Sequence, residues 1–311
     1  MSITLFLLLP LAALLLLAPL VLVVLAVTAR PDAQLGPATA AARTHAVTGS
    51  AVALVCGACA GVALAWDLLS NELGFLPRAA HVWVAAVPAA AALAHTGVLA
   101  LTEVTWPRPR GSVRRASLAA RTVPAVAPAL LRRCWLVATL SLLVVLAVAA
   151  VLAAPDGASI EAALVQDGAV VGTRGYGPFP GARYGVPAAL GALLLAAAVQ
   201  GTLRLVVDRP AVAGADAATD TALRRASAHR VVRGAAVGTL LTLAPVLLSL
   251  GSGIHRVWPS TGLQVLSGVL VVAGVLAGLA GVLLLFWVAP RVPSPAIPAA
   301  TQSAVAAQPQ R

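Results

Sequence analysis

The sequence contains no lysine, and few of its residues carry a charge of either sign. Charged residues occupy 10% of the 311 positions, whereas hydrophobic residues occupy 60%. Because a soluble domain carries about a quarter charged residues, this composition excludes an ordinary water-soluble protein. The mean hydropathy of +0.96 instead predicts an integral membrane protein. The lack of lysine beside abundant Ala, Val, Leu and Pro indicates a GC-rich coding sequence.

Acidic residues are also scarce, and none lies in the interior of a long apolar run. Carboxylates within spans are typical of proton relays and ion pathways, so their absence argues against an ion-coupled transporter. The sequence has no GxxxxGK[ST], HExxH or GxSxG motif, and such motifs carry nucleotide, zinc and serine-hydrolase chemistry. We therefore expect no catalytic residue, no metal and no cofactor, and an enzyme is the less favoured class.

Seven apolar runs are long enough to cross a bilayer as helices. All six tryptophans stand at the ends of these runs, where indole rings prefer the headgroup interface. The first run is too long for a signal-peptide core and no basic residue precedes it, so we expect it to remain uncleaved. The sequence predicts an all-α, seven-helix transmembrane domain over 1–289 and a disordered cytoplasmic tail over 290–311, with spans at about 4–27, 46–66, 80–102, 134–154, 184–207, 234–252 and 264–288.

The arginines are unevenly divided between alternate loops. Only four of the 21 lie on one side, namely Arg78, Arg174, Arg183 and Arg256. The positive-inside rule therefore places the N-terminus outside and the C-terminus inside a bacterial plasma membrane. Basic residues between apolar runs, without interleaved aromatics, favour lipid over nucleic acid as the partner. We expect anionic headgroups on the inner face to meet Arg110, Arg114, Arg115, Arg121, Arg224, Arg225 and Arg233.

Two short segments predict local structure outside the spans. The outer loop, 155–183, contains AALVQDGAVVG, in which apolar runs flank Asp167-Gly168. This dipeptide is typical of a type I′ turn, so we expect a small extracytoplasmic β-hairpin. In the second of two RRAS tracts, Asp220 is expected to cap a helix that runs into the sixth span.

Cys56 and Cys59 form a CxxC motif within the second span. Redox or metal chemistry would need thiolates, which an apolar environment disfavours. The same helix carries Gly49, Ala53, Gly57 and Gly61 at four-residue steps, a spacing that brings membrane helices close together. We favour helix packing for this span and keep a redox pair as the alternative. Gly274 and Gly278 in the seventh span predict either a second intramolecular contact or a homodimer.

His95 is the one ionisable side chain clearly inside a predicted span. Intramembrane ionisable residues are functional candidates, although a neutral histidine also packs well. Gln200 and Arg204 share one face of the fifth span, and they would line a solute path with His95 if the third and fifth spans are neighbours.

The segments GPFPGARYGVPAALG (177–191) and LRRASAHRVVRG (223–234) resemble a family of uncharacterised multi-pass membrane proteins of GC-rich bacteria. The resemblance covers mainly the outer loop through the sixth span. It implies a location and an architecture, and it brings no activity.

Three functions remain open at this point. The first is a non-enzymatic membrane component or subunit of a larger complex. The second is a transporter or channel for a small solute, with a path at His95, Gln200 and Arg204. The third is a thiol-redox membrane protein that uses Cys56 and Cys59.

Overall fold

The computed structural model describes residues 36–69, 83–107, 122–213 and 215–289. In these ranges the chain is mostly helical, with one two-stranded sheet. Three predicted features lie outside the described residues: the first span at 4–27, the cluster of Arg110, Arg114, Arg115 and Arg121, and the tail at 290–311.

Six of the described helices are long and apolar enough to cross a membrane. Each coincides with one of the predicted spans after the first, and a short helix, α4, precedes the third of the six. In chain order the elements are α2 (Pro37–Leu69), α3 (Val87–Val104), α4 (Val123–Val126), α5 (Ala129–Leu152), β1 (Ile160–Gln166), β2 (Ala169–Tyr176), α6 (Ala182–Asp208), α7 (Ala217–Val257) and α8 (Thr261–Leu285).

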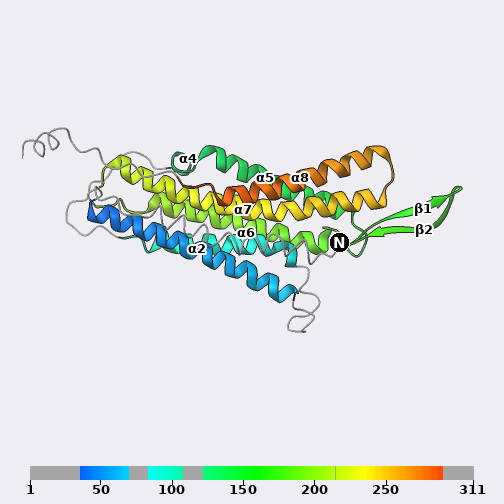
Figure 1. The fold of residues 1–311 in the computed structure, drawn as a ribbon, viewed down its shortest axis with the longest axis horizontal. Coiled ribbons are helices and arrows are strands. Elements are labelled where there is room, and N and C mark those ends of the chain that lie inside the picture. The colour runs from blue at the N-terminus through cyan, green and yellow to red at the C-terminus, as the bar shows by residue number, and fades with distance from the viewer. Residues whose placement is uncertain (1–35, 70–82, 108–121, 214, 290–311) are drawn as a thin grey trace, which may run out of the picture.

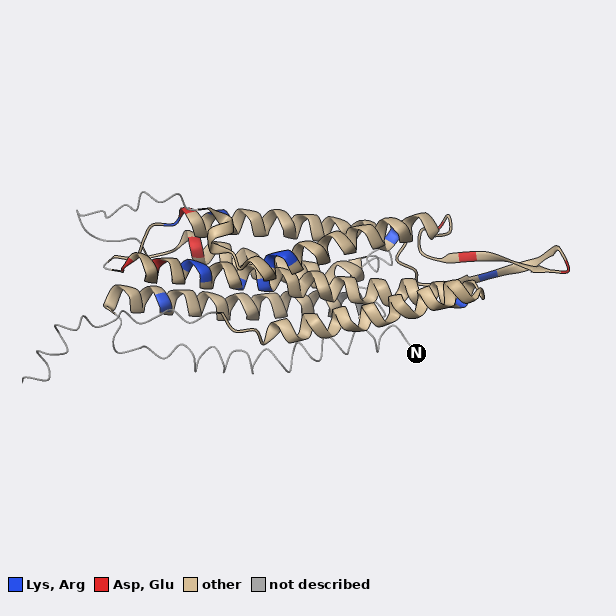
Figure 2. Ribbon diagram, turned by 90° about the horizontal axis from the view of Figure 1, so that it is seen from above, with Lys and Arg blue, Asp and Glu red and all other residues tan. Residues whose placement is uncertain are grey.

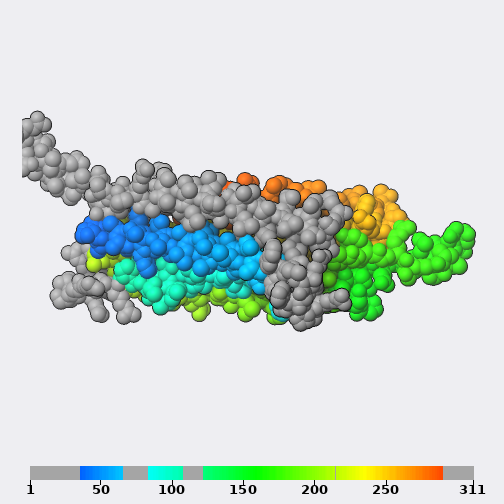
Figure 3. All heavy atoms as spheres, turned by 60° about the horizontal axis from the view of Figure 1, so that its bottom comes forward, coloured from blue at the N-terminus to red at the C-terminus, as the bar shows by residue number. Residues whose placement is uncertain are grey.

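The helices lie side by side in one elongated bundle, and the strands project from one end along its long axis (Figure 1). The space-filling view shows the strands as a narrow extension beyond the helical body (Figure 3). We call the end of the bundle from which the strands project the hairpin end. At the opposite end α3, α6 and α8 finish while α2, α5 and α7 begin, and we call it the arginine end.

The central element is α7, which contacts every other described helix and both strands. It is 41 residues long, or about 60 Å at 1.5 Å per residue, twice the thickness of a hydrocarbon core. The helix begins at Ala217, well before the span predicted from 234, because Asp216 caps it by accepting a hydrogen bond from the Thr219 backbone N–H at 2.7 Å. The expected cap, Asp220, lies inside the first turn instead.

The predicted β-hairpin is present. Strands β1 and β2 pair antiparallel, with Ile160 opposite Tyr176 and Gln166 opposite Ala169. Asp167 and Gly168 both adopt positive φ, 51° and 78°, as a type I′ turn requires. Buried Ile160 and Phe179 pack the base of the hairpin against α7, and Ser249 donates a hydrogen bond to the Pro178 carbonyl at 2.8 Å. The segment after β2 therefore caps the bundle and fixes the hairpin to it.

Candidate functional site: the arginine end of the bundle

Most charged residues of the described chain lie in the half of the bundle away from the hairpin (Figure 2). Several of them are buried, which is costly for a charge unless it is paired or hydrogen-bonded. The buried members come from the ends of α3 and α6 and from α7, and they are Glu103, Arg209, Asp220, Arg224 and Arg233, with half-buried Arg230 beside them.

Arg224 binds the end of α6. Its side chain is 2% exposed, and its Nε donates to Asp220 at 2.9 Å. Its terminal nitrogens donate to three carbonyls, those of Val206 at 2.6 Å, Val207 at 2.8 Å and Arg209 at 2.8 Å. The last carbonyls of a helix lack intrahelical partners and carry partial negative charge. Arg224 therefore neutralises the C-terminus of α6 and joins it to α7.

A buried ion pair joins the end of α3 to the end of α6. Arg209 Nη1 lies 2.9 Å from Glu103 Oε2, and these side chains are 1% and 5% exposed. The same nitrogen donates to Ser227 Oγ at 3.3 Å, and the guanidinium lies 3.6 Å from the centroid of the Trp106 ring. Burial lowers the pKa of Arg209, an effect that Glu103 opposes. A guanidinium stays charged even so, so this contact is an ion pair reinforced by a cation–π interaction.

Two more arginines of α7 reach helices on other sides of the bundle. Arg230 Nη1 donates to the Ala46 carbonyl at 2.6 Å and to Ser50 Oγ at 2.7 Å, both on α2. Arg233 donates to the Trp287 carbonyl at 2.8 Å, just beyond the end of α8. One helix thus holds α2, α6 and α8 through arginine side chains.

These contacts change the interpretation of the second RRAS tract. The tract was expected to meet lipid headgroups, but the side chain of Arg224 is buried and Arg233 is 6% exposed, and both donate to protein carbonyls. Only Arg225 of the three predicted residues is exposed. The physical reason is helical geometry: residues 224 and 225 lie about 100° apart around α7, so one faces the core and the next faces outward.

The predicted solute path is not assembled. His95 is buried where α3 crosses α2 and α7, and a Cβ at Gly234 of α7 would collide with its ring. Helices α3 and α6 are neighbours, as the path required, yet Gln200 and Arg204 lie on the exposed face of α6. Tertiary packing therefore separates the three residues.

Two buried histidines keep unpartnered ring nitrogens. Within the described part of the chain, His95 Nδ1 and both ring nitrogens of His229 have no hydrogen-bond partner. His229 also meets the Trp287 ring edge-on, with centroids 5.8 Å apart. His95 packs against Gly234 and His229 packs against Trp287, so each imidazole contributes to helix packing in the described structure.

The small-residue pattern of α2 faces α3. Added Cβ atoms at Gly57 and Gly61 would meet Ala91 and the Cβ of His95 within 3.0–3.3 Å, and one at Gly49 would overlap Thr102. Cys56 is half-buried and flanks this face, whereas Cys59 is exposed. Among the described residues, no group of three His, Cys, Asp or Glu side chains could hold a metal ion.

The small residues of α8 face α7. A Cβ at Gly274 would lie 2.8 Å from Leu248 Cγ and 3.0 Å from the Ala244 carbonyl, and one at Gly278 would contact Ala244 at 3.5 Å. Gly274 and Gly278 were predicted to serve either an intramolecular helix contact or a homodimer, and in the structure they form an intramolecular contact with α7.

Sequence reasoning missed Glu103, Arg209, Asp216 and Arg230 as a group. The one available signal was Glu103 itself, a carboxylate at the very end of an apolar span that is followed by an arginine-rich loop. Its partner Arg209 lies 106 residues away, and periodicity within one segment carries no information about a contact of that kind.

Comparison with known proteins adds no activity to this geometry. No protein-family model, no curated protein and no solved structure matches the chain. The resemblance to bacterial multi-pass proteins stays a prediction, and what the described residues establish is a helical protein with six candidate membrane-spanning helices and a buried arginine cluster at one end.

Proposed function

We propose that the chain is a non-enzymatic component of a bacterial plasma membrane, which it crosses seven times with the N-terminus outside and the C-terminus inside. In this proposal it works as a subunit of a larger membrane complex. The buried arginine cluster gives the subunit a rigid inner end, and the β-hairpin presents a contact surface on the outside.

The observation that carries the proposal is a contrast between the core and the hairpin. The buried arginines of the core each bind a helix end, a helix carbonyl or a carboxylate, so these groups serve structure. The tip of the hairpin is the opposite case, because Val165 is 58% exposed and Val170 is 68% exposed. A lone two-stranded hairpin is marginally stable in water, and an exposed apolar tip favours contact with another protein.

The position of the tip favours a protein over lipid as its partner. A strand of eight residues reaches about 25 Å, and the hairpin continues the long axis of the bundle (Figure 1). If the bundle axis lies along the membrane normal, the tip stands in water beyond the headgroups. We therefore assign the tip to a protein neighbour in the complex.

A photo-crosslinking amino acid at Val170 tests this assignment in native membranes. We expect one discrete protein adduct, which Val165→Asp, made in the protein that carries the photo-crosslinking residue at position 170, should abolish without a change in the thermal unfolding midpoint. Leu279, which is exposed on α8, is the matched control for a lipid-facing position. The same pattern of adducts from both positions, or no protein adduct from Val170, would refute the proposal.

The proposed orientation rests on the distribution of arginine. Of the arginines in the described ranges, only Arg174, Arg183 and Arg256 lie at the hairpin end, and an excess of Arg favours the cytoplasmic side. Reporter fusions after Gly168 should therefore report an outside location. Changing Arg110, Arg114, Arg115 and Arg121 together to Gln should weaken or invert the local topology, whereas Arg174→Gln should leave it unchanged. An inside location for the hairpin would overturn the orientation.

A further inference from the structure

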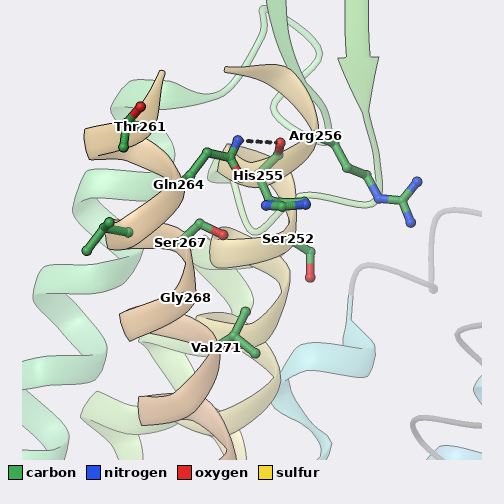
Figure 4. Close-up of a pocket in the computed structure, with 9 residues that line it drawn as sticks. Ser252, His255, Arg256, Thr261, Gln264, Ser267, Gly268 and Val271 are labelled. Atoms are coloured by element: carbon green, nitrogen blue, oxygen red, sulfur yellow. Dashed lines mark hydrogen bonds between the residues drawn. The ribbon is translucent and has the colours of Figure 1, made fainter. Parts of the chain in front are cut away.

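A groove opens between the last turns of α7 and the first turns of α8, at the hairpin end. Its volume is about 640 Å³, within the range of about 300–1,000 Å³ found for small-molecule sites. Figure 4 shows residues of both helices around it. The residues that matter for its chemistry are Ser252, His255, Arg256, Thr261, Gly268 and Val271.

Small residues create this groove. The two helices are in close contact at Gly251, where Ser267 donates to the Gly251 carbonyl at 2.9 Å and a Cβ would lie 2.9 Å from the Ser267 carbonyl. The next residue of α8, Gly268, faces away from that contact, and a Cβ there would meet nothing within 4 Å. The groove is therefore an open channel beside a tight helix pair.

The lining changes from polar to apolar along the groove. His255, Arg256 and Thr261 stand at the hairpin end, where Trp258 ends α7, and a tryptophan at a helix end marks the headgroup interface. Val265, Gly268 and Val271 follow along α8 toward the middle of the bundle. Thr261 and Val271 are ten residues apart, or about 15 Å, which is half the thickness of a hydrocarbon core. The groove therefore spans one leaflet.

Arg256, at the polar end of the groove, carries a positive charge outside the ion pairs of the described residues. The Arg256 guanidinium lies 5.3 Å from the centroid of the Tyr176 ring. Figure 4 shows its side chain extending outward from α7, on the hairpin side of the groove. An anionic group in the headgroup region can approach this guanidinium and His255 together.

We infer that this groove binds one phospholipid with an anionic headgroup. The phosphate group lies at His255 and Arg256, and one acyl chain runs along Val265, Gly268 and Val271. This lipid site is separate from the arginine end and independent of the hairpin contact proposed above.

The experiment measures the lipid retained by the purified full-length chain, by native mass spectrometry in detergent, after incubation with phosphatidylglycerol or phosphatidylcholine. We expect the wild-type protein to retain a single phosphatidylglycerol in preference to phosphatidylcholine. Gly268→Leu fills the groove and should abolish this retention. Gly201→Leu is the matched control, because Gly201 is exposed on α6 and its Cβ would also meet nothing within 4 Å.

A second pair of variants separates the headgroup from the chain. Arg256→Gln should weaken phosphatidylglycerol binding about fivefold, as expected for one cation near a membrane surface, and should leave phosphatidylcholine binding unchanged. Arg174→Gln, which changes an exposed arginine of β2 that does not line the groove, should leave both unchanged. Equal retention by the Gly268→Leu and Gly201→Leu proteins, each with a wild-type unfolding midpoint, would overturn the inference, and so would a wild-type protein with no preference between the two lipids.

Discussion

Helices α7 and α8 are neighbours in sequence and in space, yet they differ sharply in burial. In α7, 72% of the most apolar 18-residue window is buried, against 17% in α8, which is the more apolar helix. A soluble protein would bury the more apolar helix. In a bilayer the hydrocarbon takes the place of the core, so the helix with more polar side chains moves to the centre, where other helices provide partners for them.

The largest effect should come from breaking a polar contact of α7. Arg224→Leu removes the guanidinium that donates to Asp220 and to the last carbonyls of α6, and breaking a buried pair costs about 3–5 kcal/mol. Arg225→Leu changes the adjacent, exposed arginine and should alter stability by less than about 0.5 kcal/mol. Unfolding by increasing SDS in mixed micelles measures both. Equal losses in the two variants would mean that the burial of Arg224 has no energetic consequence.

A smaller effect should follow from filling the contact between the two helices. Gly274→Leu on α8 forces a side chain against Leu248 and the Ala244 carbonyl of α7, and overpacking of this kind costs about 1–3 kcal/mol. Gly262→Leu is made on the same helix at a position where a Cβ would meet nothing within 4 Å. The same SDS titration should show destabilisation only for Gly274→Leu; a destabilised Gly262→Leu would contradict the assignment of the two faces.

The start of α7 provides a test that depends on pH. The hydrogen bonds from Thr219 hold the pKa of Asp216 below its usual 3.8. A lowered pKa means that the capping contribution is present above pH 3.8 and is lost as the pH falls through the folded-state pKa. Asp216→Ala should therefore lower the unfolding midpoint at pH 7, and its difference from the wild type should shrink as the pH falls below 3.8. Asp216→Asn, which caps without titrating, should remain close to wild type at pH 7. A pH-independent difference for Asp216→Ala would rule out the ionised cap.

The smallest effect is expected on α2, which resembles α8 in its low burial of 22%. Replacing Cys56 and Cys59 together by Ala removes one half-buried and one exposed thiol and leaves the glycines of the α3 contact in place, so stability should stay within about 0.5 kcal/mol of wild type. Cross-linking from Val170 should also be unchanged. A loss of stability, or a loss of cross-linking from Val170, would support the thiol-redox hypothesis.

The sequence predicted the parts of the structure that depend on neighbouring residues. Asp167-Gly168 identified the turn because both residues tolerate positive φ, and the four-residue steps from Gly49 to Gly61 identified the contact face of α2 because they match the period of a helix. Gln200 and Arg204 were correctly placed on one face of α6. That this face points outward, away from His95, depends on how α6 packs against α3, and one helix cannot specify it.

By itself, therefore, the sequence determined the six apolar helices that are candidates to cross a membrane, and the hairpin, because each of these follows from local hydropathy or turn chemistry. Only the tertiary structure decided which arginines are buried. Arg224 and Arg225 are chemically identical and adjacent, and their different roles come from tertiary packing. Arg224 donates to the carbonyls at the end of α6, whereas Arg225 is exposed on the surface of the bundle. A charge can be buried in an apolar protein only where hydrogen-bonding or charged partners surround it, and for Arg224 most of those partners are brought together by the assembled bundle.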